Sequence, residues 1–120
     1  MKLIGSKLEQ ELKEQLIKSN QSLFKSEEKR RLLEVIRSSF SEMKATYIVN
    51  WIPEQGEDIY KILINDNIIA EIELDRYSDE VEPIVEFEDV PHYLQGLSKH
   101  NQIKLAVALD LAKQELKNMK

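Results

Sequence analysis

Carboxylates are the side chains of this sequence whose types and spacing could do chemistry, and they are concentrated between positions 66 and 90. That stretch of 25 residues contains ten Asp or Glu side chains and one basic residue, Arg76, so its net charge is −9. The net charge of the whole chain is −5, and the remainder is therefore mildly basic, at +4. A concentrated negative field steers cationic molecules toward a surface and speeds their association. The chemistry that this pattern indicates is electrostatic recognition of a basic partner.

Alternation with apolar residues places several of these acids on one side of β-strands. We predict that six of them share the solvent face of two neighbouring strands and bind a basic partner protein: Glu71, Glu73, Asp75, Glu82, Glu86 and Glu88. Two alternatives are a solvated face that deters edge-to-edge aggregation and a site for a divalent metal ion. Because side chains at alternate strand positions diverge, whereas a metal needs converging oxygens, we expect no metal site.

Sequence motifs of the common enzyme classes are missing. The chain has no cysteine, only three glycines, and no serine-hydrolase, phosphate-loop or zinc-protease motif. His92 and His100 lie eight residues apart, without the spacing of metal ligands. Asp58 with Glu71 and Glu73 resembles the acidic hairpin of many metal-dependent nucleases, but Glu73 stands where those enzymes have lysine. We therefore expect neither catalytic activity nor a bound cofactor.

Length and composition are those of one ordinary globular domain spanning residues 1–120. Hydrophobic residues make up 42% of the chain and charged residues 32%, which allows a single apolar core. The N-terminus lacks the apolar run of a signal peptide, and no apolar segment is long enough to span a bilayer. We therefore expect a cytoplasmic protein with no membrane partner. The basic run Lys29-Arg30-Arg31 is diluted by neighbouring glutamates, so we also expect no nucleic-acid partner.

Two helices are predicted within residues 1–44, where they would form a helical hairpin. The first begins with a capping-box spacing from Ser6 to Glu9 and ends where residues 19–22 interrupt the apolar period. Ser26 is predicted to cap the second helix. The apolar face of that second helix consists of Leu32, Leu33, Ile36, Phe40 and Met43.

A period of two replaces the helical period in residues 45–90 and predicts an antiparallel meander. We expect its four strands at residues 46–52, 59–64, 68–74 and 81–87. Pro83 cannot donate a hydrogen bond to a neighbouring strand. The fourth strand should therefore lie at a sheet edge or carry a bulge.

The turn at residues 65–67 decides which side chains face the core. A two-residue turn would mix glutamates with isoleucines on one face, whereas a three-residue turn pairs Ile62 with Ala70 and makes that face wholly apolar. A slip of one residue would invert every side chain, so the hydrophobic pattern should decide the register. We therefore predict the three-residue turn, with Asn67 as its left-handed residue.

The segment after residue 91 is predicted to be a loop followed by a helix over residues 98–120 that covers the apolar sheet face. The main apolar stripe of this helix is Leu105, Ala108, Leu109, Ala112, Leu116 and Met119. A second stripe of Ile103, Val107 and Leu111 lies more than about 100° around the helix. The N-terminal helices could cover this second stripe, or it could form the contact of a homodimer.

These elements define a single α+β domain in the order α-α-β-β-β-β-α. The helical hairpin occupies residues 1–44, the antiparallel sheet residues 45–90, and the loop and C-terminal helix residues 91–120. We expect a small cytosolic protein-binding or inhibitory module, of the immunity, anti-defence or accessory type, whose acidic sheet face binds a basic protein; the comparison rests on size and charge. The alternative is a homo-oligomeric structural or assembly protein that uses the second stripe of the C-terminal helix.

Overall fold

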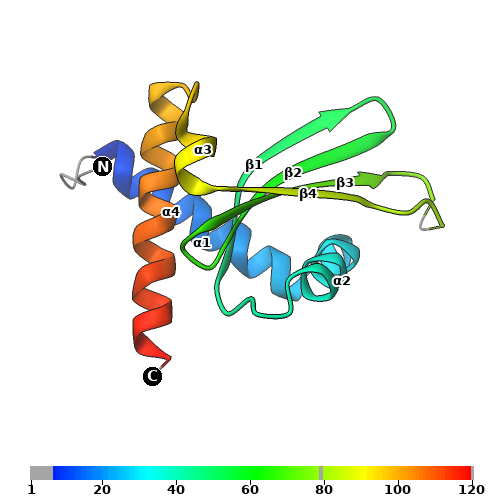
Figure 1. The fold of residues 1–120 in the computed structure, drawn as a ribbon, viewed down its shortest axis with the longest axis horizontal. Helices are drawn as coiled ribbons and strands as arrows, with labels where there is room; N and C mark the ends of the chain where they lie inside the picture. The colour runs from blue at the N-terminus through cyan, green and yellow to red at the C-terminus, as the bar shows by residue number, and fades with distance from the viewer. Residues whose placement is uncertain (1–6, 79, 120) are drawn as a thin grey trace.

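A four-stranded antiparallel sheet forms the centre of the molecule, with helices on both of its faces (Figure 1). The computed structural model describes residues 7–78 and 80–119, apart from the side chain of Glu28. The elements are, in order, α1 (Lys7–Lys25), the 3-10 turn η1 (Glu27–Lys29), α2 (Arg30–Ser39), β1 (Thr46–Glu54), β2 (Glu57–Ile64), β3 (Ile68–Asp75), β4 (Ile84–Asp89), α3 (Val90–Leu94) and α4 (Lys99–Asn118). The predicted α+β class is therefore confirmed, with α3 as an additional short helix. Within the described ranges, every helix is too short or too polar to cross a membrane.

The first helix is longer than the sequence pattern predicted. Residues 19–22 do not end α1, which continues for 19 residues. Leu12, Leu16 and Leu23 are almost fully buried, and their spacing of i, i+4 and i+11 keeps them on one side of the helix. Burial of Leu23 against the core thus keeps the last turns helical through the polar residues that favoured a break. The predicted cap at Ser6 lies outside the described residues.

The second helix begins later than predicted, at Arg30. Residues 27–29 form a 3-10 turn, in which the N–H of Lys29 donates to the carbonyl of Ser26 over 3.3 Å. Lys29 is the residue that precedes α2, and its side chain makes no capping hydrogen bond. Leu32, Leu33 and Ile36 are buried on α2 as predicted, but the helix ends at Ser39, so Phe40 and Met43 pack beside them from the segment that follows it.

The strands lie in the order β1-β2-β3-β4, each antiparallel to its neighbour, as the meander prediction required. The pairing of β2 with β3 sets Ile62 opposite Ala70 and confirms the three-residue turn. The left-handed residue of that turn is Asn65 (φ 55°) and not Asn67. The side-chain oxygen of Asn65 also accepts the backbone N–H of Ala45 over 3.1 Å. This hydrogen bond ties the turn to the segment that enters β1, which explains why Asn65 adopts the unusual conformation.

The fourth strand begins at Ile84, so the predicted strand starts three residues too early. Pro83 lies directly before β4, in keeping with its inability to donate to a ladder, and the strand is at the sheet edge as predicted. The strand continues to Asp89, whose side chain accepts the N–H of His92 over 2.8 Å and thereby caps α3. Residues 81–83 therefore belong to the connection between β3 and β4.

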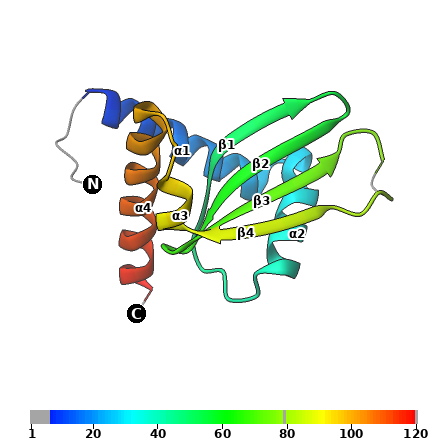
Figure 2. The same cartoon turned by 45° about the horizontal axis from the view of Figure 1, so that its top comes forward.

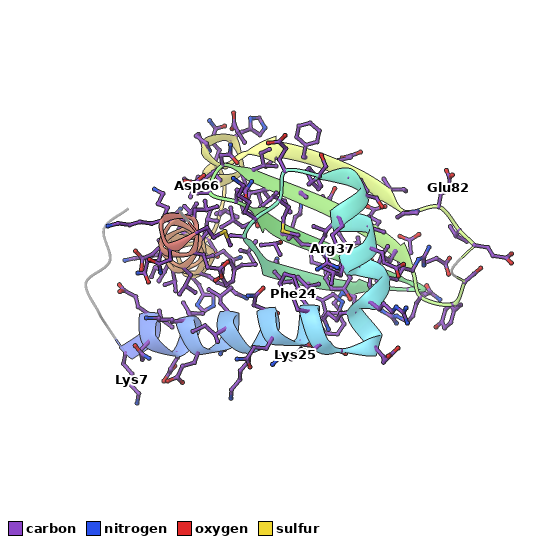
Figure 3. All side chains as sticks on the ribbon, turned by 90° about the horizontal axis from the view of Figure 1, so that it is seen from below. Lys7, Phe24, Lys25, Arg37, Asp66 and Glu82 are labelled. Carbon is purple, nitrogen blue, oxygen red and sulfur yellow. The ribbon has the colours of Figure 1, made fainter. Side chains whose placement is uncertain are left out.

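The two faces of the sheet pack against different helices, and α2 lies across one of them (Figure 3). One face, which includes Ile62, Ala70 and Ile72, packs against α2 and the C-terminal end of α1. The opposite face, at the end that carries Leu63 and Ile69, packs against α4 and α1. The expectation that the C-terminal helix covers the first face is therefore wrong. At this end the sheet is apolar on both faces, so the hydrophobic pattern alone did not distinguish the two placements.

The second stripe of α4 lies inside the molecule. Val107 is 4% exposed and Leu111 is 8% exposed, and both belong to the core that α4 shares with α1 and β1. Ile103 is half-buried at the start of the same stripe. The chain's own elements thus cover this stripe, which was the first of the two interpretations. The homo-oligomeric alternative loses the surface on which it was based.

Replacement of Ile72 tests the assignment of the sheet faces. Ile72 is 0% exposed and lies between Tyr60 on β2 and Val85 on β4. We expect Ile72→Ala to lower the free energy of unfolding by about 2–5 kcal/mol. Ile84 is 54% exposed and provides the control, because Ile84→Ala should cost less than about 0.5 kcal/mol. Urea unfolding followed by circular dichroism measures both, and a larger loss at Ile84 than at Ile72 would mean that the faces are inverted.

A charge at Val107 tests whether the second stripe is core or an interface between copies. The carboxylate of Val107→Glu would be buried without a partner, so we expect a loss of more than about 4 kcal/mol or complete unfolding. Lys113 is exposed on the same helix, and Lys113→Glu should leave the fold intact. Light scattering of the wild type should give a mass near the 14.1 kDa of one chain. A wild-type dimer that Val107→Glu converts into a folded monomer would refute this placement.

Candidate functional site: an acidic sheet face

The sheet face that packs against α4 is covered only at one end, and the rest of it is open (Figure 2). The strands extend past α4, and their register arranges the side chains of this face in transverse rows. From the far end toward α4, the rows are Glu54, Glu57 and Asp75, then Ile52, Ile59, Glu73 and Ile84, then Asn50, Lys61, Glu71 and Glu86. Carboxylates thus lie on both sides of a row that is mostly apolar.

The carboxylates of these rows, together with Glu88 nearer to α4, form what we term the acidic face: Glu54, Glu57, Glu71, Glu73, Asp75, Glu86 and Glu88. Strand register brings five of the six predicted site residues together here. Glu71 lies directly opposite Glu86, and Glu73 lies opposite Ile84. Like charges in such cross-strand positions repel each other and weaken the sheet by a few tenths to about 1 kcal/mol per pair.

Two of the predicted site residues differ from the others in position or in partner. Glu82 is exposed in the connection before β4, because the strand begins only at Ile84, and it is not part of the acidic face. Asp75 is on the face, but its carboxylate accepts the N–H groups of Tyr77 and Ser78 over 2.8 and 2.9 Å. Asp75 therefore closes the turn after β3 and is engaged within the chain.

Two further members of the face, Glu54 and Glu57, were not predicted, and they lie opposite each other across the first hairpin turn. That turn consists of Gln55 and Gly56. Gly56 has a φ of 81°, a backbone conformation that residues with a side chain rarely adopt. A glycine at the second position of a two-residue turn is a hairpin signal that could have predicted this pairing. The expected strands, ending at residue 52 and resuming at residue 59, left a connection too long to bring the two glutamates together.

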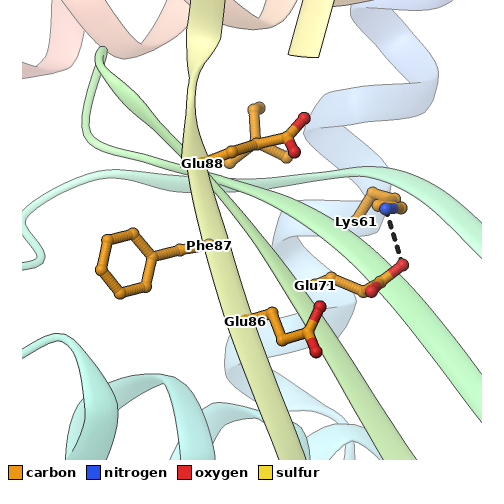
Figure 4. Close-up of a pocket in the computed structure, with 6 residues that line it drawn as sticks. Lys61, Glu71, Glu86, Phe87 and Glu88 are labelled. Carbon is orange, nitrogen blue, oxygen red and sulfur yellow. Dashed lines mark ion pairs between the residues drawn. The ribbon is translucent and has the colours of Figure 1, made fainter. Parts of the chain in front are cut away.

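Lys61 is the basic residue of the described part of this face, and it pairs with Glu71. The distance from Lys61 Nζ to Glu71 Oε1 is 2.6 Å, and both side chains are mostly buried (Figure 4). The Lys61 ammonium also lies 5.9 Å from the centre of the Tyr93 ring on α3. Glu86 and Glu88 line the same hollow, whose volume is about 60 Å³. A cationic group therefore already sits among these carboxylates, and it neutralises only one of them.

The repulsion on this face is most evident at Glu73. Partial burial raises the pKa of Glu73 above its ordinary value, and four surrounding carboxylates raise it further. In decreasing order of effect, these carboxylates are Glu57, Glu71, Glu86 and Glu54. A cation beside Glu73 would relieve this repulsion.

Arg76, the base within the acidic stretch, is engaged on the other side of the sheet. Its guanidinium donates to Asp58 Oδ1 over 2.8 Å, and this partner holds the pKa of Asp58 below its usual value. The indole N–H of Trp51 donates to the same carboxylate oxygen over 3.0 Å. Asp58 faces the same side as Tyr60 and Ile62, away from the acidic face. Arg76 therefore does not neutralise the carboxylates of the acidic face.

Arg31 on α2 fixes the connection that carries the chain from β3 to β4. Its guanidinium donates to the backbone carbonyls of Asp75 and Ser78 over 3.2 Å each and to that of Val81 over 2.5 Å. One side chain of the opposite layer therefore holds three carbonyls, one at the end of β3 and two in the connection that follows it. This anchoring sets where β4 can begin and so determines which glutamates of β4 lie beside β3.

The described residues provide no cluster of three or more His, Asp or Glu side chains that could hold a metal ion. The acidic face fits this finding geometrically, because its carboxylates project in parallel from a sheet and do not converge on a point. His92 on α3 and His100 on α4 are both exposed and belong to separate helices. The chemistry that the arrangement supports is binding of positive charge over an extended surface.

Comparison with known proteins identifies no relative of this chain. No family model, no curated protein and no solved structure matches the chain at a significant level.

Substitution of Glu73 tests the repulsion within the acidic face. Because the pKa of Glu73 is raised on folding, the ionised carboxylate opposes folding once the pH rises through that pKa, and this penalty is absent at lower pH. At pH 7, Glu73→Gln should therefore melt about 1–2 °C above the wild type. Near about pH 3, where the carboxyl is protonated in both states, the two melting temperatures should coincide. Scanning calorimetry at both pH values measures this, and a variant that is less stable at pH 7 would contradict it.

Proposed function

We propose that this protein is a small cytosolic protein-binding or inhibitory module, of the immunity, anti-defence or accessory kind, that binds a basic protein on its acidic face. The observation that carries the proposal is the crowding of carboxylates around Glu73, with Lys61 paired to Glu71 and Arg76 paired on the opposite side. Repulsion of this kind opposes folding, and a basic partner would convert it into attraction.

The apolar row within the acidic face supports a protein as the partner. Ile52 and Ile59 are partly exposed, and Ile84 is 54% exposed, between the two rows of carboxylates. Stable protein interfaces combine a central apolar patch with a polar or charged rim. A small cation or a polyamine would use the charges of this face but would leave its isoleucines in water.

The acidic face should act mainly on the rate of association. Charges around an interface steer diffusional encounter, and this effect weakens as salt shortens the Debye length toward about 8 Å and below. A fast-binding inhibitor or accessory protein benefits from this steering.

A paired charge reversal tests the proposed function. Glu73→Lys combined with Glu86→Lys should leave the melting temperature equal or higher, because mutual repulsion is removed. The same double variant should bind a basic partner about tenfold more slowly or worse. The matched control is Glu11→Lys with Glu14→Lys, which makes the same charge change on the exposed side of α1.

The measurement is capture of proteins from the source cell with the wild type, the reversal and the control as parallel baits. We expect a basic protein to be retained by the wild type and the control, to be lost with the reversal, and to elute from the wild type as salt rises. Capture of the same proteins by all three baits would reject the docking function and leave the acids as a solubilising surface.

A further inference from the structure

The outer strand β4 presents a free edge. In the described part of the chain, the sheet order ends with β4, and β3 is the strand that pairs with it. The opposite edge strand, β1, is covered by α1 and α4, whereas α2 lies on a face of the sheet and not along the outer side of β4 (Figure 2). An uncovered edge strand offers a row of backbone N–H and C=O groups to another strand.

The two faces of this edge differ in chemistry. Glu86 and Glu88 project on the acidic face, next to Glu71 and Ile69 of β3. On the other face Phe87 is 69% exposed, and its ring meets that of Phe40 edge-on with centroids 6.1 Å apart. A strand placed beside β4 would therefore meet Glu86 and Glu88 on one face and Val85 and Phe87 on the other.

A groove of about 300 Å³ lies between α2 and Pro83, the residue that precedes β4. The lining residues are Arg31, Glu34, Val35, Ser38, Ser39 and Pro83. An added strand thus has space for side chains on the face that carries Phe87.

We propose that the basic partner contributes an extended segment that pairs with the free edge of β4 and becomes a fifth strand of the sheet. This inference rests on the proposed function and specifies how the partner is recognised. Backbone hydrogen bonds to β4 would supply affinity, and alternate side chains would supply specificity. The segment would carry Lys or Arg at the positions beside Glu86 and Glu88 and apolar residues at the positions beside Phe87.

Charge selects this occupant over a second copy of the chain. Pairing of β4 with the β4 of another molecule would place Glu86 and Glu88 of both chains on one face. Like charges across neighbouring strands destabilise a sheet, and each copy also carries a net charge of −5. The same glutamates that oppose self-association attract a segment with alternating basic residues.

The test uses the full-length protein and a short capped peptide of alternating lysine and valine, matched in length to β4. Two derivatives are N-methylated, one on the valines and one on the lysines, so that each loses the N–H groups on one edge of the peptide. Since alternate N–H groups of a strand point to opposite sides, one derivative should bind about tenfold more weakly or worse, and the other should bind like the parent. Amide shifts in a labelled protein should be largest over residues 84–89.

Variants of the protein provide the second arm of the experiment. Phe87→Thr should weaken binding of the parent peptide, whereas Tyr77→Thr, at a position that is 81% exposed in the connection before β4, should not. Equal binding of both methylated peptides, or no binding of the parent, would overturn strand addition. The proposed function fails separately, if the charge reversal at Glu73 and Glu86 retains the captured partner.

Discussion

The pairing register of β2 with β3 is the constraint on which the rest of the molecule depends. Because Ile62 lies opposite Ala70, every second residue of both strands faces the core under α2, and the residues between them face the other way. The same register sets Lys61 opposite Glu71 and assembles the rows of the acidic face. A slip of one residue would bury the glutamates and expose the isoleucines, so the apolar core and the acidic face are two consequences of one alignment.

The positions of the helices then determine which part of the acidic face is exposed to solvent. α4 packs on this side only at the end marked by Leu63 and Ile69, where α1 completes the layer and buries Val107. α2 occupies the opposite face, and its Arg31 reaches over to hold the carbonyls of the connection between β3 and β4. The helices therefore leave the far half of the acidic face open, while α2 packs against the opposite face of the same strands.

Sequence alone predicted the features that depend on local alternation and missed those that depend on tertiary contacts. The strand order, the register at Ile62 and the edge position of β4 follow from side-chain period and from Pro83. The helix that covers each face does not, because Leu63 and Ile69 make both faces apolar at one end. The late start of β4, which removes Glu82 from the face, reflects hydrogen bonds from Arg31 fifty positions away in the chain, which no local pattern contains.

Edge protection accounts for only part of the acidic face. Glu86 and Glu88 lie on the edge strand, where charge deters pairing with another copy. Glu57, Glu71 and Glu73 lie on the inner strands β2 and β3, which have neighbours on both sides, so charge there gives no such protection. Partial burial raises the pKa of Glu73, the inner carboxylates Glu57 and Glu71 raise it further, and a cation, Lys61, is accommodated beside them. An arrangement that weakens the isolated sheet and favours added positive charge is what the proposed basic partner requires.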